Sequence, residues 1–198
     1  MSGLTVDAAR AEISGPDEAI RALLASDEPI EVEPPLLADG IRAARAPAAR
    51  FRVTGFEETL RAVADARAGA LILTRPGGAT ALRACTPSGL LGLLVRAVGL
   101  RPRPRIPATP LTVPARVVAE RSTEERMLQE HFDALAAHWR IEAYGAGIGW
   151  YLEVLDSELG LWMVEDAGEG RLTLTPTDAT AVLDELAALP GHVGLGPS

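Results

Sequence analysis

Few side chains in this chain have a type and a spacing that would support catalysis or metal binding. Cys85, the single cysteine, lies in an apolar stretch with no general base nearby, so we interpret it as a small core residue rather than a nucleophile. His131 and His138 are seven residues apart on a predicted helix, with Glu130 and Asp133 close by. Helical metal sites more often use spacings of three or four. We therefore expect neither a nucleophile nor a metal site here.

Two glycine-rich runs, 75–78 and 145–149, are the remaining candidates for ligand chemistry. A phosphate-binding loop lies between a buried parallel strand and a helix, and neither run has that setting. Both runs therefore predict turns. We expect no catalytic residue, no bound cofactor and no metal, and we do not expect an enzyme.

Aromatic residues gather in one segment and could serve either as a core or as a partner-binding surface. Trp150 and Tyr151 are adjacent on a predicted strand, so their side chains must leave it on opposite faces, and at least one should face away from the core. Six of the eight aromatic residues lie between positions 132 and 162, namely Phe132, Trp139, Tyr144, Trp150, Tyr151 and Trp162.

A protein-binding surface is therefore expected on the sheet of the second half of the chain. Apolar anchors ringed by polar groups are typical of such surfaces. The acidic residues flank strand turns and are interpreted as a solvated rim. The candidate anchors are Trp150, Tyr151 and Trp162, and the candidate rim consists of Asp156, Glu158, Glu165 and Asp166.

The charge of the chain excludes some classes of partner. The net charge is −8, and it is uneven, because residues 1–100 carry 11 Arg against 12 acidic residues while 101–198 carry 8 against 15. The second part thus has a charge of −7 and would repel nucleic-acid phosphates and anionic membranes. All 19 basic residues are Arg, which indicates a GC-rich genome such as that of an actinobacterium.

The remaining bulk features predict a globular cytoplasmic protein. Hydrophobic residues make up 47% of the 198 residues and charged residues 23%, as in ordinary globular domains. The longest apolar stretch, 89–100, is interrupted by Arg96 and is too short to span a bilayer. There is no secretory signal pattern, and one cysteine cannot form an internal disulfide. The oligomeric state is left open.

Local patterns predict an α+β fold in which 1–99 and 111–198 are two halves joined by an Arg- and Pro-rich connector at 100–110, packed as one domain. Residues 1–13 and 34–50 have no clear pattern. In the first half we predict helices at 16–25, 54–64 and 86–98, and strands at 29–33, 50–54, 70–74 and 79–85. In the second half we predict one helix that is capped by Ser122 and runs to Trp139, and a second that is capped by Thr175–Asp178 and stops at Pro190. The predicted strands of this half are 111–115, 140–144, 148–155, 159–164 and 172–175.

An internal repeat organises these elements. Segments 69–98 and 160–189 each read as strand, glycine turn, strand, Thr-Pro and amphipathic helix. The Thr would cap the helix, and the Pro would occupy its first turn, where no N–H is needed. The repeat predicts two quasi-symmetric halves, each with antiparallel strands and a C-terminal helix capped by Thr-Pro. The two segments should therefore superpose.

The same segments resemble a known family. The first hairpin and helix, the connector and Leu111-Thr-Val-Pro-Ala115 resemble the middle of the EspG family of type VII (ESX) secretion-associated proteins. The run Gly160-Leu-Trp-Met-Val-Glu-Asp166, followed by Arg171 to Ala179, is similar to its C-terminal segment. The likeness covers about 69–115 and 148–190. It implies two quasi-symmetric α+β halves and a cytosolic chaperone that keeps PE–PPE-type or related substrates soluble before export, without nucleotide or metal.

Three hypotheses for the function remain open. The first is a chaperone or adaptor that binds a helical secretion substrate. The second is an immunity-type or other neutralising binding protein, because the acidic second half would suit a basic toxin. The third is an enzyme whose active site is assembled from scattered residues. Neighbouring genes would separate the first two, since ESX machinery would accompany one and a polymorphic toxin the other.

Overall fold

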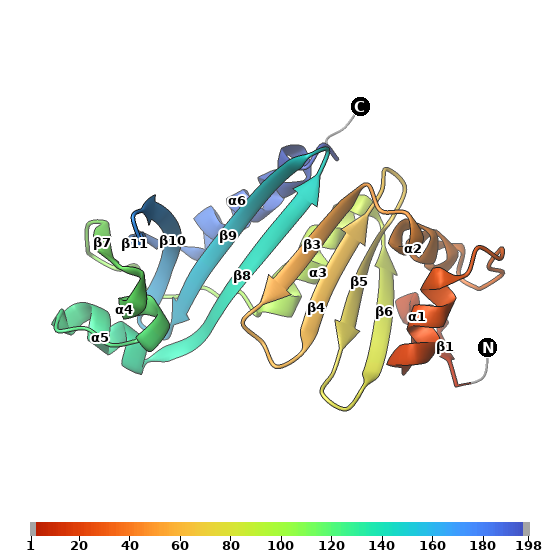
Figure 1. Ribbon diagram of the computed structural model, residues 1–198, viewed down its shortest axis with the longest axis horizontal. Coiled ribbons are helices and arrows are strands. Elements are labelled where there is room, and N and C mark those ends of the chain that lie inside the picture. The colour runs from red at the N-terminus through yellow and green to blue at the C-terminus, as the bar shows by residue number, and fades with distance from the viewer. Residues whose placement is uncertain (1–2, 196–198) are drawn as a thin grey trace. The chain divides into compact units, whose positions relative to one another are not determined.

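The computed structural model describes residues 3–195 of the chain, which has an α+β fold. Within these residues, eleven strands form an antiparallel sheet with the order β1-β2-β6-β5-β4-β3-β8-β9-β10-β11-β7, and six α-helices accompany it (Figure 1). In that described part, no helix is long and apolar enough to cross a membrane.

The described residues fall into two compact units that are not consecutive halves of the chain. The first unit contains 3–98, 142–150 and 188–195, and the second contains 99–141 and 151–187. The break at residue 99 lies at the start of the predicted connector. The tip of the β8–β9 hairpin and the end of the last helix group with the first unit.

The strands of the first unit pair as antiparallel neighbours along their full lengths. Alternation is clearest in β3, where every second side chain from Ala49 to Val53 is buried. The predicted hairpin at 70–85 is confirmed. The strands are β1 (Thr5–Asp7), β2 (Glu12–Pro16), β3 (Ala49–Thr54), β4 (Thr59–Ala64), β5 (Gly69–Thr74) and β6 (Ala79–Cys85).

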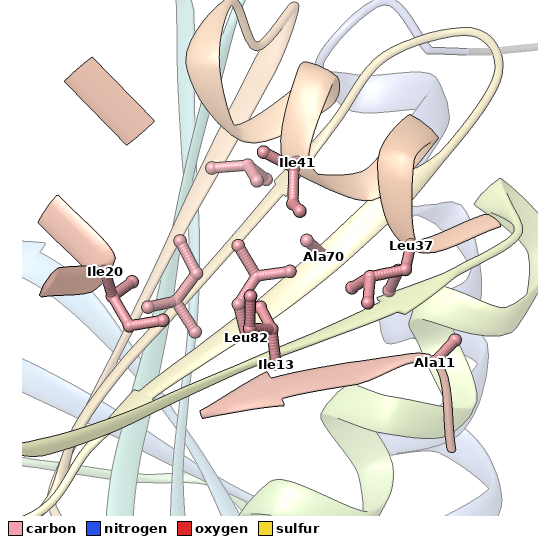
Figure 2. Close-up of a cluster of buried hydrophobic side chains, with 10 residues drawn as sticks. Ala11, Ile13, Ile20, Leu37, Ile41, Ala70 and Leu82 are labelled. Carbon is pink, nitrogen blue, oxygen red and sulfur yellow. The ribbon is translucent and has the colours of Figure 1, made fainter. Parts of the chain in front are cut away.

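Three helices belong to this unit, and they cover both faces of its strands. Gly40 of α2 approaches Ala84 so closely that a Cβ at position 40 would collide with it, whereas Leu90 of α3 lies near Cys85, on the opposite face of β6. The helices are α1 (Asp17–Ala25), α2 (Pro35–Arg45) and α3 (Pro87–Val98). The core beneath α1 and α2 is built around Ala11, Ile13, Ile20, Leu37, Ile41, Ala70 and Leu82 (Figure 2).

Two predictions for the first half are wrong, and two segments without a clear sequence pattern form regular elements. The predicted helix at 54–64 is a turn and strand β4, because pairing with β3 and β5 on both sides buries Ala62–Ala64 completely and removes any alternation. Residues 5–16 form two strands with a short 3-10 turn (Ala8–Arg10) between them, and 35–45 form a helix. The predicted strand at 29–33 has no sheet partner.

The second unit contains two short helices, three strands and parts of β8, β9 and α6. The connector at 100–110 has no helix or strand, as predicted. The elements are β7 (Leu111–Pro114), α4 (Ala115–Glu120), α5 (Arg126–Asp133), β8 (Leu135–Gly145), β9 (Ile148–Ser157), β10 (Gly160–Gly168), β11 (Arg171–Thr177) and α6 (Ala179–His192).

The long helix predicted from Ser122 to Trp139 is also wrong. Helix α5 ends at Asp133, and Trp139 lies in β8, where it is buried together with Ile141 and Ala143 at a spacing of two. The cap is Glu125, whose carboxylate accepts a hydrogen bond from the Leu128 N–H. The hydrophobic residues after 133 follow the period of a strand, which a helical pattern starting upstream had concealed.

The Thr-Pro caps differ between the two segments of the repeat. Thr86 accepts a hydrogen bond from the Gly89 N–H, and Pro87 begins α3, as predicted. Thr175 and Pro176 instead lie inside β11, and Asp178 caps α6 by accepting hydrogen bonds from two N–H groups, those of residues 180 and 181. Helix α6 also continues through Pro190 to His192, so the predicted stop is wrong.

The order of elements nevertheless repeats along the chain. A strand, two helices, four successive strands and a helix occur first as β2, α1, α2, β3–β6 and α3, and then as β7, α4, α5, β8–β11 and α6. Because Thr86 caps α3 and Asp178 caps α6, these two residues occupy equivalent positions in the repeat, and Thr175 does not. Superposition of the two runs as quasi-symmetric halves stays a prediction.

Candidate functional site

Trp162 does not project from the sheet as we expected. Its side chain is fully buried in the core of the second unit, where the ring of His131 meets it edge-on with centroids 5.4 Å apart. Helix α5 supplies Leu128 and Phe132 to the same core. Trp162 is therefore a core residue and offers no surface to a partner.

Asp156 is also buried rather than part of a solvated rim. It accepts a hydrogen bond of 2.7 Å from Nε of Arg103, while Nη1 of the same guanidinium donates to Glu158 at 2.7 Å. The Arg103 side chain is 10% exposed and that of Asp156 only 3%. This buried ion pair fixes the connector to the end of β9.

A second contact holds the connector in place. Ile106 is buried in the core of the second unit, and the backbone of Gly160 lies directly against it. A Cβ at position 160 would collide with the Ile106 side chain, and the φ of Gly160 is +148°, which side-chain-bearing residues rarely adopt. The connector is therefore a packed part of the second unit and not a solvated spacer.

Tyr151 and Asp166 do come together, on an open face of the second unit. The Tyr151 hydroxyl accepts a hydrogen bond of 3.0 Å from the Asp166 N–H, and the Arg140 guanidinium lies 4.1 Å from the centre of the Tyr151 ring. These residues line a groove of about 330 Å³ together with Ala115, Glu153, Val164, Gly168, Glu169, Gly170, Arg171 and Leu172. We call this the Tyr151 groove.

A charged network forms the floor of the Tyr151 groove. Glu153 accepts from Arg140 Nη1 at 3.3 Å, and its other oxygen lies 2.8 Å from Nε2 of His138. Burial alone would raise the pKa of Glu153, but the His138 hydrogen bond and the neighbouring charges outweigh it and hold the pKa below its ordinary value of 4.5. The groove thus presents a fixed arrangement of charge around one aromatic ring.

Replacing Glu153 with glutamine is expected to lower the free energy of unfolding by about 1 kcal/mol at pH 7. Because its pKa is lower in the folded protein, ionised Glu153 stabilises the fold above its unfolded pKa, and this contribution is lost as pH falls through the folded value. Urea unfolding of both proteins between pH 7 and strongly acidic pH measures the difference. A difference that stayed constant on acidification would contradict the assignment.

Trp150 leaves β9 on the face opposite Tyr151, as the alternation predicts. It is half-buried in the first unit, and its ring stacks on His192 with centroids 5.4 Å apart and planes 11° apart. Two apolar side chains of the same hairpin tip are exposed, Tyr144 at 52% and Ile148 at 55%. Trp150 is therefore partly accessible but separate from the Tyr151 groove.

Of the acidic candidates, Glu158, Glu165 and Asp166 are exposed, and only Asp166 lines the Tyr151 groove. The sequence analysis overlooked Arg103, Arg140 and Glu153. Arginine and acidic residues that alternate with apolar ones on β8 and β9 were a usable signal, because such residues share a face across neighbouring strands.

The described residues give no arrangement suited to nucleophilic or metal chemistry. Cys85 is buried, and this burial raises the pKa of its thiol to about 11, so it is protonated at neutral pH. Burial lowers the pKa of His131. Within 3–195, no group of three or more His, Cys, Asp or Glu side chains could hold a metal ion.

Comparison with known proteins yields a match in structure. No family model matches the sequence, and no curated protein matches it. Solved structures do match, among them that of the Mycobacterium tuberculosis type VII secretion system chaperone EspG5 in complex with a PE25–PPE41 dimer. The match has a TM-score of 0.57 at 12% sequence identity and covers 94% of this chain and 98% of that chain. The resemblance to the EspG family is thus confirmed at the level of the fold.

Proposed function

We propose that this protein is a non-catalytic cytosolic chaperone or adaptor that binds a helical PE–PPE-type or related substrate of a type VII secretion system. The observation that carries this proposal is the EspG5 fold, which extends over nearly the whole length of both chains. It is supported by sequence segments that resemble the EspG family independently of the fold. Neither nucleotide nor metal has a part in this function.

The Tyr151 groove is the surface we propose for the client. It combines a half-buried aromatic ring with oriented charged groups, an arrangement typical of an interface anchor. Asp166 belongs to this surface, whereas Glu165 leaves β10 on the opposite face and Glu158 lies in the β9–β10 turn, at the other end of both strands. Trp150 would be a second, separate anchor.

The proposal is tested by co-expressing the chain with PE–PPE-type pairs encoded near its gene and measuring complex formation by size-exclusion chromatography and calorimetry. We expect one pair to form a stable complex. Tyr151→Ala should weaken it about thirtyfold, the usual loss at an interface anchor. Tyr151→Phe is the matched control, because it keeps the ring under Arg140 and removes only the hydroxyl.

Two outcomes would contradict the proposal in different ways. If Tyr151→Ala binds like the wild type, the groove is not the binding surface although the function stands. If no PE–PPE-type pair binds, the function itself is wrong. The alternative of an immunity-type binding protein is favoured by the charge of −7 on residues 101–198, and a complex with a basic toxin encoded nearby would establish it.

A further inference from the structure

Three arginines of the first unit share one face of neighbouring strands. In the register of the sheet, Arg52 lies opposite Arg61, Arg61 opposite Ile72, and Ile72 opposite Leu82. Arg50 shares the face of Arg52, because it lies two positions away on β3. All three arginines are exposed. We call Arg50, Arg52 and Arg61 the arginine face.

The arginine face carries uncompensated positive charge. Among the described residues, none of its three guanidinium groups takes part in an ion pair or side-chain hydrogen bond, whereas Arg21 and Arg42 pair with acids on their own helices. Like charges directly opposite on antiparallel strands destabilise a sheet. The pairing of Arg52 with Arg61 therefore lowers the stability of the sheet, and it occurs in a chain whose net charge is −8.

A pocket adjoins the arginine face, between α1 and the strands β3, β4 and β5. It has a volume of about 490 Å³, and Arg21, Arg50 and Arg61 contribute to its walls. The only acid in its lining is Asp17, which is already engaged by Arg21 at 2.6 Å and by the Thr80 hydroxyl at 2.8 Å. Its apolar lining includes Ile20, Leu24, Val63 and Ile72. The pocket thus combines two arginines that have no ion-pair partner among the described residues, Arg50 and Arg61, with several apolar side chains.

We propose that the arginine face and this pocket bind an acidic segment of a protein partner. The carboxylates of the segment would engage Arg50, Arg52 and Arg61, and apolar side chains of the segment would enter the pocket. Under the proposed function, on which this inference rests, the partner is the client, so that client should carry such a segment. Arginine suits this role because its planar guanidinium binds carboxylates in a bidentate manner.

A protein segment fits these observations better than a nucleic acid does. Apolar side chains such as Ile20 and Ile72 line the pocket and would contact apolar side chains of a segment, whereas backbone phosphates would leave them uncovered. Acidic residues outnumber basic ones by eight over the whole chain, which opposes binding of a long polyanion. A short acidic segment needs only the local positive field of the arginine face.

The test uses the full chain and a labelled helical peptide with leucine at every third or fourth position and glutamate elsewhere. A second peptide carries glutamine in place of glutamate. We expect fluorescence anisotropy to show binding of the glutamate peptide that weakens with added salt, and binding of the glutamine peptide that is about tenfold weaker or more. Equal binding of both peptides would overturn the proposal.

Charge reversal locates the site. Arg50→Glu and Arg61→Glu should each weaken binding of the glutamate peptide about tenfold or more, because each replaces an attraction with a repulsion. Arg67→Glu is the matched control, since Arg67 is exposed in the β4–β5 turn and makes the same change of charge outside the pocket. If all three variants bind alike, the proposal is wrong. It is also wrong if single-stranded DNA binds at the arginine face and the peptide does not.

A stability measurement separates binding from folding. Arg61→Thr removes one of two opposed like charges and adds a residue that strands favour, so its Tm should rise by about 1–2 °C while peptide binding falls. A lower Tm would show that these arginines stabilise the sheet, and would overturn their interpretation as a binding set.

The client complex distinguishes the two proposals. If a PE–PPE-type pair binds and Arg50→Glu leaves its affinity unchanged, the inference fails and the proposed function stands. If the peptide results hold and no such pair binds, the function fails and the acidic-segment site stands.

Discussion

Replacing Trp162 with alanine is expected to lower the free energy of unfolding by about 3–5 kcal/mol, which leaves a protein of ordinary stability largely unfolded. Trp162 is fully buried, and its removal would leave a cavity between β10 and α5, lined by Leu128, His131 and Phe132. Urea unfolding followed by circular dichroism measures the loss. The core around it also contains Ile106, Leu155 and Leu174, so several elements would have to move to fill the cavity.

Trp150→Ala is the control for this experiment, because it removes the same side chain from a half-buried position. Its cost should be about 1 kcal/mol, since the indole is only half-buried and stacks on the His192 ring. If both substitutions cost the same, the division of the tryptophans into a core residue and an accessible one is wrong.

Asp156→Ala should destabilise the protein by about 3–5 kcal/mol, because it leaves the Arg103 guanidinium buried without its main counter-ion. The connector should detach from the end of β9 at the same time. Limited proteolysis with trypsin should then cut after Arg105, the one arginine of 100–110 that proline does not follow, because Ile106 beside it is buried in the wild type. Thermal unfolding and mass spectrometry of the fragments measure the two effects.

Two further variants test whether the unpaired charge of Arg103 causes the loss of stability. Glu158→Ala removes the other carboxylate that Arg103 contacts, but Glu158 is 65% exposed and water screens the pair, so the cost should stay below about 1 kcal/mol. The double variant Arg103→Met, Asp156→Leu should recover much of the stability, since it removes both buried charges together. A double variant as unstable as Asp156→Ala would show that backbone packing, and not charge, holds the connector.

These two predictions concern the scaffold, whereas the proposed binding surfaces lie elsewhere. Trp162 and Asp156 were first considered as parts of a binding surface because aromatic and acidic residues are common there. Their burial assigns them to the core and to the connector. Tyr151 and Asp166 remain accessible on the open face of the second unit.

Elements whose signals are local could be predicted from the amino-acid sequence. The hairpin at 69–85 was predicted because a Pro-Gly-Gly turn separates two short apolar strands, and both strands occupy the predicted positions. Helix α1 follows from Pro16 and the acidic residues after it, and α3 follows from the Thr86 cap. The α+β class and the resemblance to the EspG fold rest on such features, which need no knowledge of distant contacts.

Elements whose apolar pattern is ambiguous depend on contacts between distant segments. Residues 59–64 and 135–145 have apolar spacings that fit a helix as well as a strand, and pairing with neighbouring strands settles the choice. The same holds for Asp156, whose partner Arg103 lies 53 positions earlier in the chain. The arginine face likewise exists only in the register that sets Arg52 opposite Arg61. Contacts between distant segments create these features, and local propensity carries no information about them.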